Sequence, residues 1–516
     1  MKAFAELFQR LESEKNKGKV AALADYFSQA SDLDAAWALY LLNEGKSPAR
    51  IAGAQLREAV ARSTALPMWL IEESYSMVGD LAETCALLIR EHGEDEQDLH
   101  RWIDEIQQLK ALAGDQQIPA IQALWQRVPR DQLFVFNKLM TGGFRIGVAR
   151  GLLSQALALV LECTPDQVLG HLMGSWEPSE EAWQALKSGD SGYEGQPYPF
   201  FLATSWEGSD LPTSDFQIEY KLDGIRAQLV KRGNTISLWS RGEECIDTAF
   251  PDLLTQAAQI EGDCVLDGEL LVWRDGPASF NELQKRLGRK KPSAKLQSEY
   301  PVNLVVYDLL ERNRQDLRSQ PLQQRRGQLM KLAHPFATSE ALQADDWNSF
   351  DALRKNARAI KAEGLMIKRL DSPYRVGRKK GDWFKWKLDP LSLDVVLMYA
   401  QAGHGRRANL FSDYTLGVWR DGELVPVAKA YSGLSQAEME ALDKWIKANT
   451  AEKFGPVRQV PPMQVFELGF EGIQNSPRHK SGIAMRFPRI LRWRQDKPAD
   501  EANTLQDAQA ILETYG

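Results

Sequence analysis

Residues 219–228 read EYKLDGIRAQ and place one lysine, Lys221, two positions from each of two acids, Glu219 and Asp223. If the stretch forms an extended strand, these three charged side chains share one face and the apolar side chains between them share the other. Charged faces of this kind are usually solvated and salt-bridged. Taken alone, the stretch is therefore as typical of a structural strand as of a reactive site, and the rest of the chain must decide.

Short alternating segments closed by glycine-bearing turns surround this stretch and predict an antiparallel sheet. They read FQIEYKLDG, RAQLVKRG, TISLWSRG and CVLDGELLVWRDG, and the helical stretch ASFNELQKRLG follows them. We therefore expect an α+β domain over residues 206–390. After Pro390, further short strands and one helical insert, SQAEMEALDKWIKANT, suit a compact five-strand barrel over residues 391–516.

The first part of the chain reads as helical. LAETCALLIREH and DLHRWIDEIQQLKALA carry apolar residues at spacings of three and four, opposite charged faces. DQLFVFNKLMTGGFRIGVARGLLSQALALV predicts two helices joined at Thr141-Gly142-Gly143. The stretch SGDSGYEGQPYPFFLATSWEGSDLPTSD is rich in Gly, Ser and Pro and reads as a linker. We expect the helical domain to cover residues 1–205.

Composition and charge exclude several classes of protein. A length of 516 residues indicates about three domains. The net charge of −7 means that any nucleic-acid binding must come from local basic patches. No apolar run reaches the ~18 residues of a membrane span, so we expect no membrane partner. The cysteines lack Cys-x-x-Cys spacing, which argues against a zinc module and a disulfide framework and favours a reducing, cytoplasmic location.

A lysine such as Lys221 acts as a covalent nucleophile only if its amine loses a proton near neutral pH. Burial or neighbouring positive charge makes this possible. Arg226, Arg241, Lys385 and Lys387 are candidates for that positive surrounding, because alternation along strands can place them around one pocket.

Five further segments carry charged or aromatic side chains beside apolar runs: SRGEE at 240–244, LDGEL at 266–270, VVYDLL at 305–310, EGLMIK at 363–368 and WFKWK at 383–387. Each one alone is typical of a core aromatic, an amphipathic edge strand or a solvated turn acid. Their order along the chain is the informative property.

In this order, and together with KLDGIR at 221–226, the segments resemble the motifs of the ATP-dependent DNA ligases. These enzymes belong to the superfamily of lysine nucleotidyltransferases, which includes RNA ligases and mRNA capping enzymes. The last ligase motif is similar to RFPRILRWRQDK at 486–497, and LMTGGFRIGVARGLL resembles part of the helical domain that precedes the catalytic core in larger ligases. The resemblance implies an all-α DNA-binding domain, an α+β adenylation domain with antiparallel sheets, and a C-terminal OB-fold β-barrel.

The resemblance also implies a role for each motif residue at the nucleotide. Lys221 would attack the α-phosphorus of ATP, expel pyrophosphate and hold AMP through a phosphoramidate bond. Glu219 would recognise adenine, Glu269 would accept hydrogen bonds from the ribose hydroxyls, and Tyr307 would stack on the base. Phenylalanine is common at the stacking position, and tyrosine preserves the stacking.

Phosphates and metal are implied to meet a set of charged side chains. Arg226 would bind the nucleotide or the nick phosphate, and Arg241 the 5′-phosphate side. Arg378 would reach the nucleotide, while Lys385 and Lys387 would neutralise the α-phosphate as charge develops. Magnesium, or manganese in its place, would be held by carboxylates, for which the candidates are Glu269 and Glu363.

The final motif is basic, with seven Lys or Arg against one Asp between residues 478 and 497. The resemblance implies that Arg486, Arg489, Arg492 and Lys497 orient the pyrophosphate of ATP, after which the barrel swings away to meet DNA. A solvated basic face is the alternative interpretation.

The implied function is the sealing of 5′-phosphate/3′-hydroxyl nicks in duplex DNA through a lysyl-AMP and an adenylylated DNA, in repair, replication and recombination. We expect a monomeric bacterial protein that binds ATP and nicked duplex DNA in the cytoplasm, at the nucleoid. Two alternatives are an RNA ligase or guanylyl-transferring capping enzyme, and a nucleic-acid-binding scaffold without catalysis. An NAD-dependent ligase is disfavoured because the cysteines do not form a zinc-binding cluster.

Overall fold

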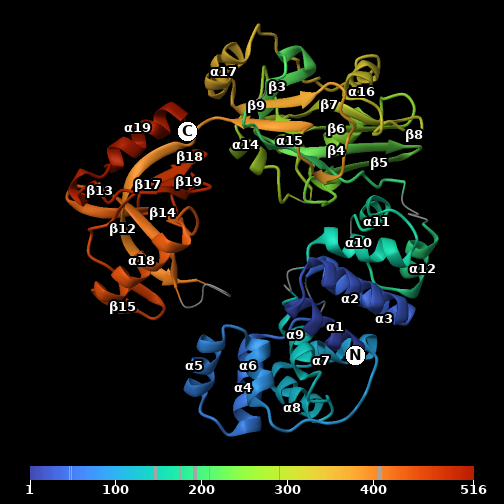
Figure 1. The fold of residues 1–516 in the computed structure, drawn as a ribbon, viewed down its shortest axis with the longest axis vertical. Helices are drawn as coiled ribbons and strands as arrows, with labels where there is room; N and C mark the ends of the chain where they lie inside the picture. Colours follow the sequence, from blue (N-terminus) through green and yellow to red (C-terminus); the bar gives the residue numbers. More distant parts are fainter. Residues whose placement is uncertain are drawn as a thin grey trace. The chain divides into compact units, whose positions relative to one another are not determined.

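The computed structural model describes residues 1–45, 47, 49–144, 148–173, 176–189, 194–208, 210–289, 291–403 and 410–515. The chain divides into two compact units, Met1–Lys387 and Leu388–Gly516. The first unit contains a helical region followed by an α+β region, and the second contains a sheet with helices (Figure 1).

The N-terminal region is helical, as its periodicity predicts. One hydrophobic core runs through it, with Trp102, Trp125 and Trp183 among its fully buried side chains. Gly142 ends one helix in the left-handed conformation, at φ +82°, as expected for the Thr141-Gly142-Gly143 junction. The helices are α1 Lys2–Ser13, α2 Asn16–Gln29, α3 Asp32–Glu44, α4 Gly53–Thr64, α5 Met68–Val78, α6 Leu81–Leu88, α7 Leu99–Ala111, α8 Gly114–Trp125, α9 Leu133–Thr141, α10 Arg150–Val160, α11 Pro165–His171 and α12 Glu180–Ser188.

The α+β region is built on two sheets. The larger sheet has the strand order β5-β4-β6-β7-β8 and is antiparallel, and the smaller sheet has the order β2-β11-β9-β3. The strands are β1 Phe201–Leu202, β2 Thr204–Ser205, β3 Phe216–Leu222, β4 Ile225–Arg232, β5 Thr235–Ser240, β6 Cys264–Val272, β7 Val302–Arg312, β8 Gln315–Asp316, β9 Ala362–Arg369, β10 Gly377–Arg378 and β11 Trp383–Lys387. The helices are α13 Pro251–Ala257, α14 Phe280–Gln284, α15 Ala294–Glu299, α16 Leu322–Leu329 and α17 Trp347–Lys355.

Two strand pairs depart from the predicted antiparallel arrangement. β1 pairs parallel with β10, and β2 pairs parallel with β11. Both partners come from segments far apart in the chain, so no hairpin turn forces the antiparallel direction. β1 and β2 precede residue 206, where the α+β domain was expected to begin, yet they pair with strands of that region.

Side chains from both sheets share a buried cluster. Val230 and Val265 of the larger sheet pack in it with Phe201 of β1 and Trp383 of β11, and Tyr307 lies at its border. Helices α14 and α16 pack on the larger sheet, and α17 packs on β9 (Figure 1). The strand ends around this cluster carry the motif residues.

The second unit is an antiparallel sheet domain. Among its described residues the sheet has seven strands rather than the five expected, because the long β12 pairs with β13 on one edge and with both β16 and β17 on the other. The strands are β12 Leu391–Ala402, β13 Phe411–Arg420, β14 Glu423–Ala430, β15 Glu452–Phe454, β16 Val457–Gln459, β17 Val465–Phe470, β18 Gly472–Asn475, β19 Ile483–Arg486 and β20 Arg489–Trp493, and the helices are α18 Gln436–Ala448 and α19 Leu505–Tyr515. Helix α18 is the predicted helical insert.

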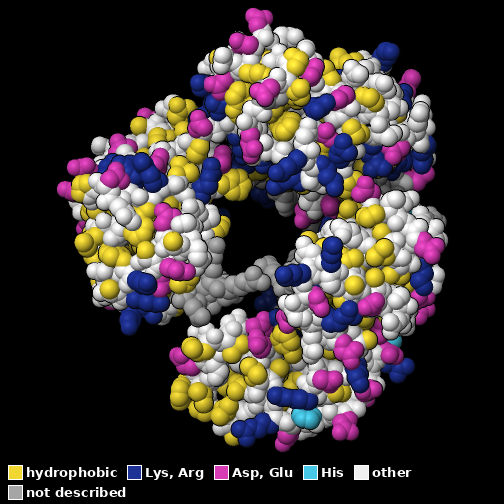
Figure 2. Space-filling model, in the orientation of Figure 1, with side chains coloured by type: hydrophobic (Ala, Val, Ile, Leu, Met, Phe, Trp, Pro, Cys, Tyr) yellow, Lys and Arg dark blue, Asp and Glu magenta, His cyan; other side chains and the backbone are white. Residues whose placement is uncertain are grey.

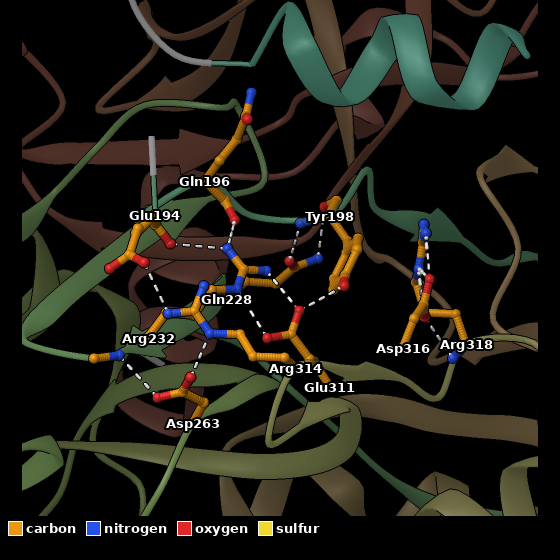
Figure 3. Close-up of polar contacts among 12 residues, drawn as sticks. Glu194, Gln196, Tyr198, Gln228, Arg232, Asp263, Glu311, Arg314, Asp316 and Arg318 are labelled. Carbon is orange, nitrogen blue, oxygen red and sulfur yellow. Dashed lines mark hydrogen bonds and ion pairs between the residues drawn. The ribbon is translucent and has the colours of Figure 1, made fainter. Parts of the chain in front are cut away.

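A polar network fastens the segment before β1 to the larger sheet (Figure 3). Arg232 of β4 makes a two-pronged ion pair with Glu311 of β7, at 2.9 and 2.8 Å, in which Glu311 is buried and Arg232 is largely covered. Tyr198 donates its hydroxyl to the same carboxylate at 2.6 Å. Around this pair, Arg314 contacts Glu194 in a half-exposed ion pair. The segment expected to be a linker is therefore attached to the sheet at Tyr198.

No helix among the described residues is long and apolar enough to cross a lipid bilayer.

The Glu311 ion pair predicts a pH-dependent loss of stability. Burial alone would raise the pKa of the Glu311 carboxyl, but Arg232 and Tyr198 lower it below its ordinary value. The pair therefore stabilises the fold above the unfolded pKa of about 4.3, and this contribution is lost as the pH falls through the lower folded value. We expect Glu311→Gln to cost about 3 kcal/mol at pH 7 in denaturant unfolding, and less at pH 3.

Glu194→Gln is the matched control. Glu194 pairs with Arg314 in a half-exposed ion pair, which should contribute less than about 1 kcal/mol to the free energy of unfolding. Equal losses in the two variants would contradict the role given to the buried pair.

Candidate active site

Lys221 lies near the end of β3, just before the turn into β4. β3 pairs antiparallel with β9, and the register shifts between Tyr220 and Leu222. This irregularity falls at Lys221 and brings its side chain to Glu363, which is near the start of β9. Lys221 Nζ lies 2.8 Å from Glu363 Oε1.

The turn after Lys221 packs against β6 so closely that only glycine fits at position 224. A Cβ on Gly224 would lie 2.3 Å from the carbonyl oxygen of Leu270 and 2.8 Å from Leu271 Cδ2. The Gly224 N–H donates to Glu269 Oε1 at 3.2 Å. The turn therefore links Lys221 to Glu269 within one site.

Glu363 bridges two lysines. Its second oxygen, Oε2, lies 2.8 Å from Lys387 Nζ on β11. Burial alone would raise the pKa of the Glu363 carboxyl, but Lys221 and Lys387 lower it below its ordinary value. The next residue, Gly364, holds β9 against β11 at φ +135°, where a Cβ would lie 2.2 Å from the Trp386 carbonyl oxygen. The sequence predicted positive surroundings for Lys221, and the structure adds a carboxylate in direct contact with the amine.

The pKa of Glu269 is displaced in the opposite direction from that of Glu363. Burial raises the pKa of the Glu269 carboxyl to about 7, and the nearby charge of Glu363 adds to this, while Lys221 and Arg226 oppose it. Two neighbouring acids thus have pKa values displaced in opposite directions. Carboxylates with pKa values displaced in this way are typical of functional sites.

A buried lysine connects the residues expected to contact adenine. Glu219 of β3 and Lys368 of β9 form a buried ion pair at 2.9 Å, and Gln217 donates to the other oxygen of Glu219. Lys368 Nζ lies 4.0 Å from the centre of the Tyr307 ring and 4.7 Å from that of Trp383. The carboxylate and the aromatic ring are therefore held by one side chain.

The Arg226 guanidinium is hydrogen-bonded within the protein through the side that carries Nε and Nη2. Its Nε and Nη2 donate to Asp267 at 3.2 and 2.7 Å, its Nη2 also donates to the Tyr374 hydroxyl at 3.1 Å, and its Nη1 donates to the Phe201 carbonyl. These bonds use four of the five N–H groups of a guanidinium. Asp267 also accepts from the hydroxyls of Tyr374, at 2.6 Å, and Tyr307, at 3.2 Å. The resemblance implied that Arg226 binds the nucleotide or the nick phosphate, and in the structure most of its N–H groups are bonded within the protein.

The remaining cations of the α+β region surround the site more loosely. Arg378 is exposed on β10, and Arg241 is exposed just after β5, with its backbone N–H donating to the Arg226 carbonyl at 3.0 Å. Burial, together with the charges of Arg378 and Lys387, lowers the pKa of the Lys385 ammonium. Lys and Arg side chains gather along one edge of the α+β region (Figure 2). Positive charge is thus concentrated where phosphates are expected.

The cations of the final motif lie in the second unit and are paired with its acids. Arg489 contacts Glu471 at 2.9 Å and Arg492 contacts Glu467 at 3.3 Å. Lys497 contacts a further acid of the same unit at 2.8 Å. Arg486, the fourth residue of the expected set, lies at the end of β19. Its guanidinium is 5.1 Å from the centre of the Phe487 ring.

The structure brings together most of the residues that the sequence pointed to in the α+β region. Contacts or nearby charges connect Glu219, Lys221, Arg226, Glu269, Tyr307, Glu363, Arg378, Lys385 and Lys387. Sequence reasoning assigned no role to Asp267, Lys368 or Tyr374. Asp267 alternates with Glu269 on one strand face, which was a usable signal, whereas Tyr374 lies outside every motif.

Comparison with known proteins gives three family matches in order: "DNA ligase N terminus" at residues 1–158, "ATP dependent DNA ligase domain" at 205–387 and "ATP dependent DNA ligase C terminal region" at 407–497. A "Probable DNA ligase" from Koribacter versatilis is 33% identical over 96% of this chain and 94% of its own length. The chain belongs to the ATP-dependent DNA ligase family. "DNA ligase 1" from Korarchaeum cryptofilum is 31% identical over 75% of this ligase and 73% of its own length.

A solved structure titled "Pmar-Lig_Pre." shares the fold of this ligase, with a TM-score of 0.63 at 17% identity, over 95% of this chain and 99% of that one. Family membership confirms that the protein is an enzyme that uses ATP and seals nicks in DNA. It also confirms the predicted three-part architecture.

We expect Gly224→Ala to slow formation of the covalent AMP adduct by more than about tenfold and to destabilise the fold by about 1–3 kcal/mol. The new methyl group would overlap the Leu270 carbonyl and displace the turn that carries Lys221. Gel detection of the labelled adduct from α-labelled ATP measures the rate.

Gly276→Ala is the control, because a Cβ there meets nothing within 4 Å. Adduct formation at the wild-type rate by the Gly224 variant would show that the close packing of the turn is unimportant.

Proposed function

We propose that Lys221 is the nucleophile of this ligase and that the side chains around it carry three nucleotidyl transfers. Lys221 Nζ attacks the α-phosphorus of ATP, and a phosphoramidate bond forms as the bond to pyrophosphate breaks. The AMP then passes to the 5′-phosphate of the nick, and the 3′-hydroxyl displaces it. The observation that carries the proposal is the contact of Lys221 with Glu363 beside Lys387, at the end of a strand that also bears Glu219.

Adenine and ribose would meet the buried part of the site. Glu219 supplies a carboxylate for the base, and the Lys368 ion pair fixes its orientation. Tyr307 offers a ring for stacking, and Glu269 lies close enough to the Lys221 turn to accept from the ribose hydroxyls. These groups are held by neighbours before any ligand arrives, so little ordering is required on binding.

The phosphates would meet cations whose charge is only partly balanced. Lys385 and Lys387 neutralise the α-phosphate, Arg378 reaches the nucleotide, and Arg241 binds the 5′-phosphate side of the nick. Arg226 has one N–H beyond its four bonds within the protein, which suits a single contact with the nick rather than a two-pronged grip on phosphate.

The carboxylates of Glu363 and Glu269 fit a magnesium ion, with manganese as a substitute. Lys221 contacts Glu363 at 2.8 Å, and the turn that follows Lys221 donates to Glu269, so both acids belong to the same site. Magnesium takes oxygen ligands and keeps several waters and substrate phosphates, so two acids are sufficient. When bound, the ion would supply positive charge at the transferring phosphate. Glu363 would then exchange its lysine partners for the metal.

The remaining assignments concern the whole chain. Arg486, Arg489, Arg492 and Lys497 would orient pyrophosphate in the first step. We propose a helical DNA-binding domain, an adenylation domain that includes β1 and β2, and a C-terminal OB-fold domain that starts at Leu388. We also propose that the ligase works as a monomer on nicked duplex DNA in the bacterial nucleoid, mainly through phosphate contacts.

Lys221→Ala should abolish the labelled AMP adduct and all sealing from ATP, because no other side chain replaces the nucleophile. Binding to nicked DNA should stay within about threefold, since one of many cations is lost. A nick that already carries 5′-AMP bypasses the lysine and should still be sealed. Gel assays with labelled ATP and with adenylylated DNA separate these steps, and a labelled adduct in the variant would refute the assignment.

Glu363→Gln should raise the magnesium concentration needed for half-maximal adduct formation by more than about fivefold, because one anionic ligand is lost. Electron paramagnetic resonance of added manganese provides a readout independent of activity and should show weaker binding. Glu194→Gln, far along the chain in a solvated ion pair, serves as the control. Unchanged manganese binding in the Glu363 variant would exclude this acid as a ligand.

A further inference from the structure

The carboxylate of Asp267 is fully buried and receives hydrogen bonds from three side chains. Arg226 Nε and the Tyr307 hydroxyl donate to Oδ1, each at 3.2 Å. Arg226 Nη2 and the Tyr374 hydroxyl donate to Oδ2, at 2.7 and 2.6 Å. A buried carboxylate without such partners would be costly, and here each oxygen receives two. The arrangement is fully satisfied and therefore rigid.

Tyr374 has two hydrogen-bonding roles in this group. Its hydroxyl donates to Asp267 and accepts from Arg226 Nη2 at 3.1 Å, so the three side chains close a ring of hydrogen bonds. Burial, with the adjacent Asp267 charge, raises the pKa of the Tyr374 phenol, so the hydroxyl keeps the proton that it donates. The ring of Tyr374 packs edge-on against Phe201 and Trp383. Both ends of the side chain are thus fixed.

A second group of an arginine, an acid and a tyrosine lies further along β4. Arg232 pairs with Glu311, and Tyr198 donates to that carboxylate at 2.6 Å (Figure 3). Each group contains an arginine of β4, a tyrosine and one acid, which is Asp267 in the first group and Glu311 in the second. They differ in position, because the Asp267 group includes the stacking ring of Tyr307 and the Glu311 group includes none of the motif residues.

We propose that Tyr374 is a positioning residue that sets the orientation of Arg226 for the steps on DNA, through its paired hydrogen bonds with Arg226 and Asp267. The proposal rests on the function assigned above to Arg226 at the nick. Without the Tyr374 hydroxyl, Arg226 loses one of its four bonds and is held through Asp267 and the Phe201 carbonyl alone. Asp267 loses one of its four donors at the same time, so the guanidinium is held less firmly in the direction proposed for its contact with the nick.

The test is Tyr374→Phe, which removes one oxygen and keeps the ring. Single-turnover sealing of a nick that already carries 5′-AMP should fall five- to tenfold. The KM for ATP in adduct formation should stay within twofold, because the lysine, the base carboxylate and the stacking ring are untouched. A loss through general destabilisation would affect both measurements together.

Tyr198→Phe is the matched control. It removes a hydroxyl with the same 2.6 Å bond to a carboxylate paired with an arginine, but outside the site. Thermal stability should fall by similar amounts in both variants, while sealing of the adenylylated nick should stay within twofold for Tyr198→Phe. Equal effects of both variants on sealing would overturn the proposal.

The Arg226→Lys variant tests whether Tyr374 affects sealing through Arg226. If Tyr374 acts through Arg226, the double variant should seal at the rate of Arg226→Lys alone. A full additional loss in the double variant would overturn the proposal and leave the role of Arg226 intact. Wild-type sealing by Arg226→Lys would instead remove the assigned role of Arg226, and the Tyr374 proposal with it.

Discussion

The antiparallel pairing of β3 with β9 is the constraint on which the site depends. An irregularity in that ladder falls at Lys221, between Tyr220 and Leu222, and places the amine beside Glu363. A slip of one residue would send every side chain of β3 to the opposite face. Close packing of Gly224 against β6 and of Gly364 against β11 fixes the two ends of this arrangement.

Glu363 and Glu269, the two acids linked to Lys221 and its turn, have pKa values displaced in opposite directions. Glu363 has a lysine on each oxygen, and its pKa is lowered. Within the part of the chain that the structure describes, Glu269 accepts one hydrogen bond, from the Gly224 N–H, and burial raises its pKa to about 7. Carboxylates whose pKa values are displaced from their ordinary values are typical of functional sites.

Much of this could be predicted from the sequence. The helical, α+β and antiparallel regions follow from periodicity, and Lys221, Glu269 and Glu363 stand in short contiguous motifs. Strands of two residues, such as β1 and β2, carry no periodicity, so their parallel pairing could not be anticipated. Roles that depend on a partner from another strand were also missed. Arg226 and Asp267 are on different strands, and nothing near Arg226 in the sequence indicates their ion pair.

The two arginine–carboxylate–tyrosine groups have a mechanical consequence for β4. Arg226 and Arg232 are six positions apart on one extended strand, which corresponds to about 20 Å. Arg226 is paired with Asp267 on the neighbouring strand β6, and Arg232 is paired with Glu311 on β7, two strands away in the sheet. β4 is therefore attached to other strands of its sheet by a side-chain ion pair near each end. We therefore expect any rearrangement during turnover to take place in other segments, while β4 keeps its position in the sheet.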